Sequence, residues 1–322
     1  MARSLRRLVF LCGSMVLGPC FAQDFPKHPV TMVVPYAAGG SADVVGRLVA
    51  AEMSKALGQN VVVELRPGAG GNIGAEYVAK AARPDGYTIL LASLSLATNV
   101  SLMKLGFDPR KDLVAIGGIS NFPNILLVSS KDPARSLQDL IARARSAPGR
   151  VTYGSSGPGT SSHLCGELLR VLAGIDIVHV PYKGSGAVYP DLIAGRVTML
   201  FDLMGSAYGH LGGGQVKAIA TTGPRRAASL PDVPTVAESG FPGFQFGAWL
   251  ALFAPAATPK EALAHLEDAM LRAIQEDSIR QRLAQLGGEP VPARAAEFSK
   301  FFEDDVERFA RLVREGKIKP LQ

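Results

Sequence analysis

Residues 151–164, VTYGSSGPGTSSHL, combine a short β-branched run, a loop of small residues and the start of a helical pattern. Gly157 and Gly159 in the loop allow the backbone to approach a ligand closely. Thr160 is a predicted N-cap, because its hydroxyl can accept a hydrogen bond from an otherwise unpaired backbone N–H. Free amides and the positive end of the helix dipole then converge on one point. The stretch therefore predicts an anion-binding loop.

The glycine-rich loops of this chain lack the residues that nucleotide-binding and hydrolytic sites need. None contains the G-x-x-x-x-G-K-[ST] pattern, and the dinucleotide pattern that begins at Gly68 meets Ile73 where a glycine is required. No G-x-S-x-G elbow is present. No two of the five histidines have i,i+4 spacing, and no cysteine pair joins them, so neither a metal site nor a cofactor is predicted. The pattern favours binding of a carboxylate through main-chain amides, without chemistry.

Two side chains beside the loop keep an enzyme open as an alternative. Cys165 is either a small buried hydrophobic residue or a nucleophile, and a nucleophile would need a partnering base. His163 lies in the first turn of the predicted helix, where it either caps and packs or contacts the ligand. The alternative is an exported enzyme that acts on a carboxylate.

Residues 1–22 are typical of a secretory signal, with three arginines, an apolar run and small residues before a cleavage point after Ala22. The apolar run is shorter than the roughly 20 residues of a membrane anchor. Without this segment the formal charge falls from +6 to +3, which weakens the case for a nucleic-acid partner. Of the three cysteines only Cys165 remains, so no internal disulfide is predicted in the exported protein.

The order strand, glycine loop, helix also occurs earlier in the chain. Residues 30–34 are a predicted strand, residues 36–42 (YAAGGSA) a loop, and Ser41 can cap a helix that ends at Gly58. Another strand at residues 61–65, another glycine loop and a helix over residues 75–82 follow.

The second copy repeats this order at a constant distance along the chain. Gly58 corresponds to Gly174, Val61 to Ile177 and Gly68 to Gly184, each 116 residues apart. Short strands that alternate with helices predict an α/β fold of two lobes, each a mainly parallel sheet flanked by helices.

The apolar runs 124–129 and 248–254 flank the second copy and are predicted to cross between the lobes. Lobe 1 would then comprise residues 23–123 and 245–322, lobe 2 residues 124–244, and the ligand cleft would lie between them. Near the C-terminus, Pro259 is expected at the first position of a helix. A stripe rich in phenylalanine on a later helix either packs on its own lobe or docks on a transporter. Its members are Phe298, Phe302, Phe309, Leu312 and Val313.

Five stretches in this order resemble a known family: VVPYAAGGSADVVGR, RPGAGGNIGAEYVAKAARPDGYTILLAS, YGSSGPGTSSHLCGELL, IVHVPYKGSGAVYPDLIAGRV and LPDVPTVAESGFPGF. The chain resembles the substrate-binding proteins of tripartite tricarboxylate transporters, the Bug receptors, from about Phe25 to its last helix. The resemblance implies a periplasmic receptor of the type II-like, Venus-flytrap kind that closes on a small carboxylate or amino-acid-like solute. It also implies delivery to membrane permease subunits by a monomer. A sensor protein is the alternative partner.

The resemblance implies ligand contacts from two loops and one further acid. The residues that match these positions are Tyr36, Ala37, Ala38, Gly39, Gly40, Ser41, Asp43, Ser155, Ser156, Gly157, Gly159, Thr160, Ser161, His163 and Asp202. Tyr36 departs from the phenylalanine common in the family, and its hydroxyl either contacts ligand or faces solvent. Asp43 either compensates the helix dipole or contacts ligand, and Asp202 either bonds a loop amide or contacts ligand. Lys183 is either a solvated loop residue or a charge partner.

Overall fold

One mixed sheet of ten strands runs through the protein, in the order β2-β1-β3-β9-β4-β7-β5-β6 with β8 and β10 attached to β4. The computed structural model describes residues 25–316 and 318–321, so the predicted secretory segment and its cleavage point lie outside the described residues. The strands are β1 (Val30–Val34), β2 (Val61–Leu65), β3 (Thr88–Ser93), β4 (Leu113–Ser129), β5 (Val151–Ser155), β6 (Ile177–Pro181), β7 (Met199–Leu203), β8 (Val216–Thr221), β9 (Gly247–Pro255) and β10 (Glu289–Pro290).

Helices cover both faces of this sheet. They are α1 (Ser41–Leu57), α2 (Asn72–Glu76), α3 (Ser95–Leu102), α4 (Pro109–Asp112), α5 (Leu137–Ser146), α6 (Ser161–Ala173), α7 (Tyr189–Ile193), α8 (Met204–Gly212), α9 (Lys260–Gln275), α10 (Asp277–Gln285) and α11 (Ala295–Arg314). No described helix is both long and apolar enough to cross a membrane.

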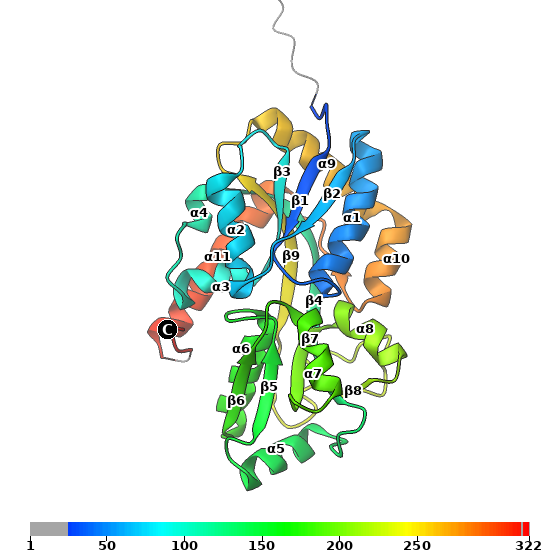
Figure 1. Ribbon diagram of the computed structural model, residues 1–322, viewed down its shortest axis with the longest axis vertical. Coiled ribbons are helices and arrows are strands. Elements are labelled where there is room, and N and C mark those ends of the chain that lie inside the picture. Colours follow the sequence, from blue (N-terminus) through cyan, green and yellow to red (C-terminus); the bar gives the residue numbers. More distant parts are fainter. Residues whose placement is uncertain (1–24, 317, 322) are drawn as a thin grey trace, which may run out of the picture.

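The sheet changes partners in the middle of β4. Up to Pro123 this strand pairs with β9, and from Asn124 onward it pairs with β7 and β8. We call β1–β3, β9, β10 and the start of β4 the first half, and β5–β8 with the end of β4 the second half. Figure 1 shows the first half at the top, the second half at the bottom, and β4 and β9 between them.

The two halves repeat one topology. In the first, β1 lies parallel between β2 and β3; in the second, β5 lies parallel between β6 and β7. The glycines that the sequence pairs 116 residues apart also share backbone conformations. Gly58 and Gly174 end helices in the left-handed region with φ of 66° and 59°, and Gly68 and Gly184 have φ of 139° and 132°. These positive φ values explain why glycine stands at both members of each pair.

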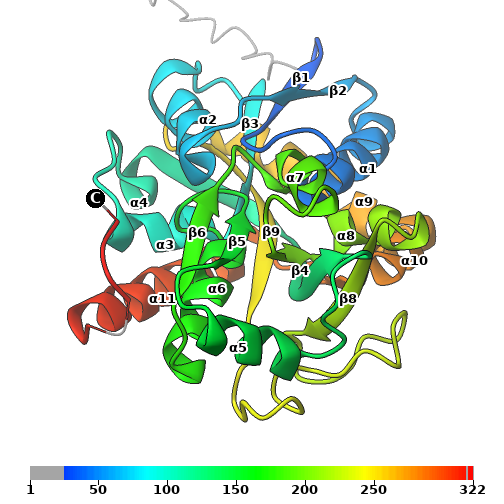
Figure 2. The same ribbon diagram turned by 60° about the horizontal axis from the view of Figure 1, so that its bottom comes forward.

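Strands in the middle of this mixed sheet are buried on both faces, because helices pack on both sides of them. Along β4, Leu126 and Val128 pack in the cluster under α5 and α6, whereas Ile125 and Leu127 pack in the cluster under α7 and α8. In the first half, α1, α9 and α10 cover one face and α2, α3 and α11 the other. Helix α8 of the second half lies beside α1 and α10 of the first in both views (Figures 1 and 2).

The phenylalanine stripe of α11 packs inward. Phe298 and Phe302 lie edge-on to Trp249 of β9, with ring centroids 5.2 and 6.1 Å away. Both are buried, as is Phe309. Of the two interpretations of this stripe, packing within its own half of the molecule is the one observed, and it leaves these three side chains unavailable for docking.

Three expected elements differ from the structure. The helix expected over residues 75–82 begins earlier, as α2, and continues into a π-helical turn, Tyr77–Ala81. β4 begins at Leu113, well before the apolar run at 124, because polar and glycine positions within it are paired with β9. Pro259 precedes α9 as its N-cap, with ψ of 141°, and is not its first helical residue.

Candidate functional site

Two loops with the same backbone geometry meet at the boundary between the halves. One joins β1 to α1 and the other joins β5 to α6. Gly39 and Gly159 occupy equivalent left-handed positions, with φ of 78° and 72°. The next residues, Gly40 and Thr160, are extended N-caps with ψ of 163° and 162°. The structure thus brings the N-termini of α1 and α6, with their positive dipole ends, to one region.

Neither loop uses the side-chain cap that the sequence suggests. The N-cap of α1 is Gly40, and Ser41 instead accepts the Ser206 amide at 2.8 Å. Thr160 is the N-cap of α6 as predicted, but its hydroxyl donates to the Gly157 carbonyl at 2.6 Å and does not cap the helix. The capping predictions for both hydroxyls are therefore wrong. The N-cap residues leave the first-turn amides of both helices unbonded by their side chains, which suits an anion site.

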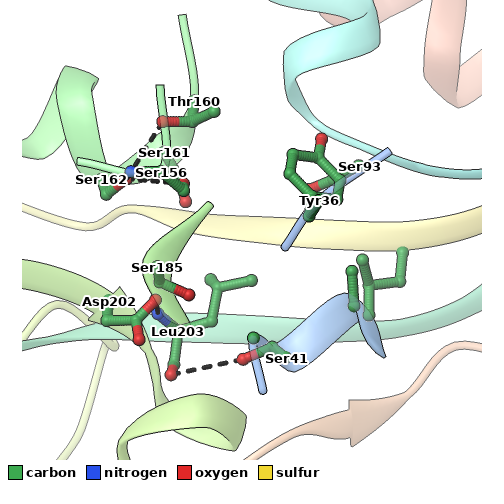
Figure 3. Close-up of a pocket in the computed structure, with 13 residues that line it drawn as sticks. Tyr36, Ser41, Ser93, Ser156, Thr160, Ser161, Ser162, Ser185, Asp202 and Leu203 are labelled. Atoms are coloured by element: carbon green, nitrogen blue, oxygen red, sulfur yellow. Dashed lines mark hydrogen bonds between the residues drawn. The ribbon is translucent and has the colours of Figure 1, made fainter. Parts of the chain in front are cut away.

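A small pocket, partly open to solvent, lies between these loops. Its walls come from both halves of the molecule (Figure 3). The lining residues are Tyr36, Gly40, Ser41, Ala42, Ser93, Ser156, Thr160, Ser161, Ser162, Ser185, Asp202, Leu203 and Leu250. Seven of these carry aliphatic hydroxyls and none is a lysine, arginine or histidine. An anion bound here would be held by hydroxyls and amides, not by a cationic side chain.

Asp202 is the one carboxyl group of the lining, and it is held by the protein itself. Its oxygens accept hydrogen bonds from the Tyr189 hydroxyl at 2.8 Å, the Leu203 amide at 2.8 Å and the Ser206 hydroxyl. Burial raises the pKa of Asp202, while these hydrogen bonds oppose the rise. Asp202 belongs to β7, and its carboxyl group holds neighbouring residues of the pocket wall in place through these hydrogen bonds.

Tyr36 also lines the pocket, but its hydroxyl is engaged elsewhere. It shares a 2.6 Å hydrogen bond with Ser95 Oγ of α3. The residue is buried, and this burial raises the pKa of Tyr36 to about 12. The hydroxyl therefore does not face solvent, and the ring is fixed as a neutral wall between the pocket and α3.

Seven of the fifteen predicted site residues line the pocket, and the other eight lie outside the lining. Those outside it are Ala37, Ala38, Gly39, Asp43, Ser155, Gly157, Gly159 and His163. Asp43 accepts the Gly39 amide at 3.0 Å and pairs with Arg47 at 2.7 Å. His163 Nδ1 accepts the Gly159 amide at 3.2 Å. Both side chains hold loop backbone in the observed structure.

Six lining residues are not among these fifteen, although Ala42 and Ser162 lie within the two predicted loops. They are Ala42, Ser93, Ser162, Ser185, Leu203 and Leu250. Two had a usable signal: Ser93 ends a parallel strand, where ligands of α/β sheets bind, and Ser185 stands in the KGSG loop recognised as a counterpart of the earlier glycine loop. Leu250 belongs to the apolar run 248–254, which was predicted to cross between the lobes but was not assigned to the site.

Direct contacts join the two halves beside the pocket. The Ala37 amide donates to the Lys183 carbonyl at 3.1 Å, and the Thr98 hydroxyl donates to the Gly159 carbonyl at 2.6 Å. Backbone approaches backbone so closely that a Cβ on Gly186 would lie 2.0 Å from the Ala38 carbonyl oxygen. The exposed Lys183 side chain takes no part in these contacts, in keeping with a solvated loop residue. The structure therefore has the two halves in contact across the pocket.

Cys165 does not contribute chemistry to this pocket. It is fully buried, it lies outside the lining, and burial raises the pKa of its thiol well above the usual value. Of the two interpretations of Cys165, a small buried hydrophobic residue or a nucleophile, the structure supports the first. Among the described residues no group of three or more His, Cys, Asp or Glu side chains could hold a metal ion.

Residues 45–318 match the family described as the tripartite tricarboxylate transporter family receptor. The chain belongs to this family. It is similar to the periplasmic binding protein BugD, with a TM-score of 0.88 and 33% identity over 92% of this chain and all of that one. It is also similar to Rpa4515 of R. palustris, solved with adipate, with a TM-score of 0.88 and 34% identity over 92% of this chain and 100% of that one. For MatC of Rhodopseudomonas palustris, solved with bound malate, the TM-score is 0.84 and the identity 35%, over 90% of this chain and 100% of that one.

These similarities confirm the predicted fold class and the family resemblance. The protein is a solute-binding receptor of the Bug type, with the α/β fold of periplasmic binding proteins. Receptors of this kind act with tripartite tricarboxylate permeases.

Proposed function

We propose that this receptor is exported to the periplasm, captures a small carboxylate between two lobes, and passes it to the membrane subunits of a tripartite tricarboxylate transporter. The observation that carries the proposal is the pocket at the paired N-termini of α1 and α6. It is lined by hydroxyls and backbone and has no cationic side chain. The site residues would be the predicted loop residues together with the additional lining residues, and no catalytic step is assigned to any of them.

The two lobes of this proposal are residues 23–123 with 245–322, and residues 124–244. The change of strand partners between Pro123 and Asn124 supports the first boundary. In the described part of the chain the backbone crosses between the halves twice, within β4 and on the way into β9, an arrangement suited to a hinge. Opening would break the hydrogen bond from Ala37 to Lys183 and the one from Thr98 to Gly159.

Several features support a carboxylate as the ligand. Burying a carboxylate without hydrogen bonds is expensive. The two helix N-termini supply amide donors from both sides, and the Ser161 hydroxyl, which accepts a hydrogen bond from Asn124, keeps its own proton to donate. A relative of similar structure was solved with adipate and another with malate. Asp202, whose oxygens already accept three protein donors, would shape the wall without meeting the ligand as a free anion.

A thermal-shift screen against mono-, di- and tricarboxylates and acidic amino acids tests the ligand class. A ligand at 100 times its Kd should add roughly 2.7 kcal/mol to the free energy of unfolding. The proposal fails if no carboxylate raises the melting temperature of the mature protein and none co-purifies with it.

Closure is tested by X-ray scattering on the protein with and without the ligand that the screen identifies. We expect a smaller radius of gyration on binding. The Gly186→Ala variant should remain open when ligand is added, because its new Cβ would strike the Ala38 carbonyl oxygen. The control variant Gly209→Ala, whose Cβ has no atom within 4 Å, should close normally. An unchanged radius in the wild type, or closure of Gly186→Ala, would contradict the hinge.

Transfer to a permease and signalling through a sensor protein use the same pocket and differ in the partner. Capture of membrane subunits from solubilised membranes by ligand-loaded protein, and not by empty protein, is the expected result. Loaded protein that captures a sensor protein and no permease subunit would support signalling in place of transport.

A further inference from the structure

The two pocket loops are tied down in the same way by different chemistry. In the β1–α1 loop the Gly39 amide donates to Asp43, four residues later, at 3.0 Å. In the β5–α6 loop the Gly159 amide donates to His163 Nδ1, also four residues later, at 3.2 Å. Since Gly39 and Gly159 have matching backbone conformations, His163 takes the place that a carboxylate has in the other loop.

A second histidine supports the same loop from below. His179 Nε2, on β6, lies 2.6 Å from Ser155 Oγ, and this hydroxyl accepts the Gly157 amide at 3.1 Å. The imidazole rings of His163 and His179 are 4.3 Å apart between centroids. Two side chains thus hold the two glycines of one loop, and both depend on imidazole nitrogens.

The groups around this pair leave little to stabilise an imidazolium. On β5 the Tyr153 ring stacks on His179 at 4.9 Å, and its hydroxyl donates to Glu167 of α6 at 2.6 Å. Arg170, also on α6, pairs with the same carboxylate at 2.8 Å. Although burial opposes them, these hydrogen bonds lower the pKa of Glu167, so it is a carboxylate whose charge Arg170 largely neutralises.

We propose that His163 is a positioning residue whose neutral imidazole holds the anion-binding loop in shape, and that protonation of this ring releases the loop and weakens ligand binding. The proposal rests on the carboxylate-receptor function proposed above for its effect on affinity. Its effect on the loop itself is independent of any ligand.

The hydrogen bond from Gly159 gives this dependence its direction. Nδ1 of His163 accepts only while it carries no proton, and in the imidazolium both ring nitrogens are donors. A protonated ring would therefore present an N–H to the Gly159 N–H, and the buried amide would lose its acceptor.

Burial sets the pH range of this change. It lowers the pKa of His163, despite the opposing charge of Glu167, and it lowers the pKa of His179 to about 4. The unfolded chain then binds protons that the folded loop excludes, so loop stability is complete above about pH 6.5 and falls as the pH drops below it.

Gly159 connects the loop to both the pocket and closure. Its carbonyl accepts the Thr98 hydroxyl from the first half at 2.6 Å, and the residues that follow it, Thr160 and Ser161, line the pocket. When Gly159 leaves its position, the pocket loses part of its wall and the two halves lose a contact.

NMR on the ligand-free, isotope-labelled mature protein tests the loop. Between pH 7.5 and 4.5 the Gly159 amide shift should follow the titration of the His163 ring carbon, whereas the Gly39 amide, tied to Asp43, should not. In His163→Asn, whose Oδ1 can accept without titrating, the Gly159 shift should become independent of pH. A Gly159 resonance that ignores the His163 titration would overturn the proposal even if carboxylates bind.

Affinity for the carboxylate found in the screen gives the second measurement. For the wild type we expect affinity to fall about tenfold between pH 7 and pH 5, the order expected for a lost buried hydrogen bond. His163→Leu should bind about tenfold more weakly at pH 7 for the same reason. His163→Asn should recover most of that loss and remove the pH dependence. Affinity that rises on acidification, or an Asn variant that keeps the wild-type pH profile, would refute the link to binding.

Discussion

Gly159→Ala combines two costs that the structure allows to be separated. At φ of 72° the residue is in the left-handed region, where an L side chain is strained by about 1–2 kcal/mol. The new Cβ would also lie 1.7 Å from Asn99 Oδ1 and 2.8 Å from its Cγ, and Asn99 belongs to α3 in the other half. The strain acts whether or not the halves meet. The clash acts only when they do.

Gly174→Ala is the matched control for the backbone strain. Its φ is 59°, and no atom lies within 4 Å of a Cβ at this position. Both variants should lose about 1–2 kcal/mol of unfolding free energy. Overpacking of a close contact costs about 1–3 kcal/mol. Because only Gly159→Ala meets the clash on closing, its ligand affinity should fall roughly 5- to 150-fold while that of Gly174→Ala stays unchanged.

Isothermal titration calorimetry with the carboxylate from the screen, together with urea unfolding of the free proteins, measures both quantities. Asn99→Ala in the Gly159→Ala background should restore much of the affinity, since it removes Oδ1, Cγ and Nδ2, the three atoms nearest to the Cβ. If Gly159→Ala and Gly174→Ala bind equally well, or if Asn99→Ala fails to restore binding, the observed contact between α3 and the loop is not part of the ligand-bound state.

Further outcomes are expected at three other residues. Tyr36→Phe, which loses the bond to Ser95, should lower the unfolding free energy in urea by about 1 kcal/mol. The wild type should lose stability between pH 10 and about 12, where the folded protein keeps the Tyr36 proton that the unfolded chain releases, and the variant should lose less. Cys165→Ala should leave affinity unchanged, and the native thiol should resist alkylating reagents until denaturant is added. Trp249→Phe removes the 2.8 Å indole N–H donor of the buried Asp305 and should cost about 1–3 kcal/mol in thermal or urea unfolding.

Much of the architecture follows from local signals in the sequence. β-branched runs at residues 30–34 and 61–65 are strands within the predicted bounds. Gly58 and Gly174 end helices where expected, because a left-handed residue after a helix favours glycine regardless of what surrounds it. The internal correspondence of the two halves was detectable for the same reason: each copy repeats the same local dihedral requirements.

The hydrogen-bond partners of the residues that line the pocket could not be predicted from local signals in the sequence. Ser41 stands at a helix start, so local rules favour a cap, yet its hydroxyl bonds Ser206, 165 residues away. Tyr36 bonds Ser95 for an equally non-local reason. Side-chain hydroxyls take whichever partner the assembled fold presents, and no periodicity in the chain encodes that partner.

The sequence by itself thus determined the strand–loop–helix units, the two glycine loops and the family. Backbone dihedral preferences and hydrophobic periodicity act over a few residues and can be recognised in the chain. Only the tertiary structure decided which residues line the pocket and which hold the loops from behind, as Asp43 and His163 do. These roles depend on distances between segments that are brought together by the sheet, with β4 and β9 placing residues from three parts of the chain around one site.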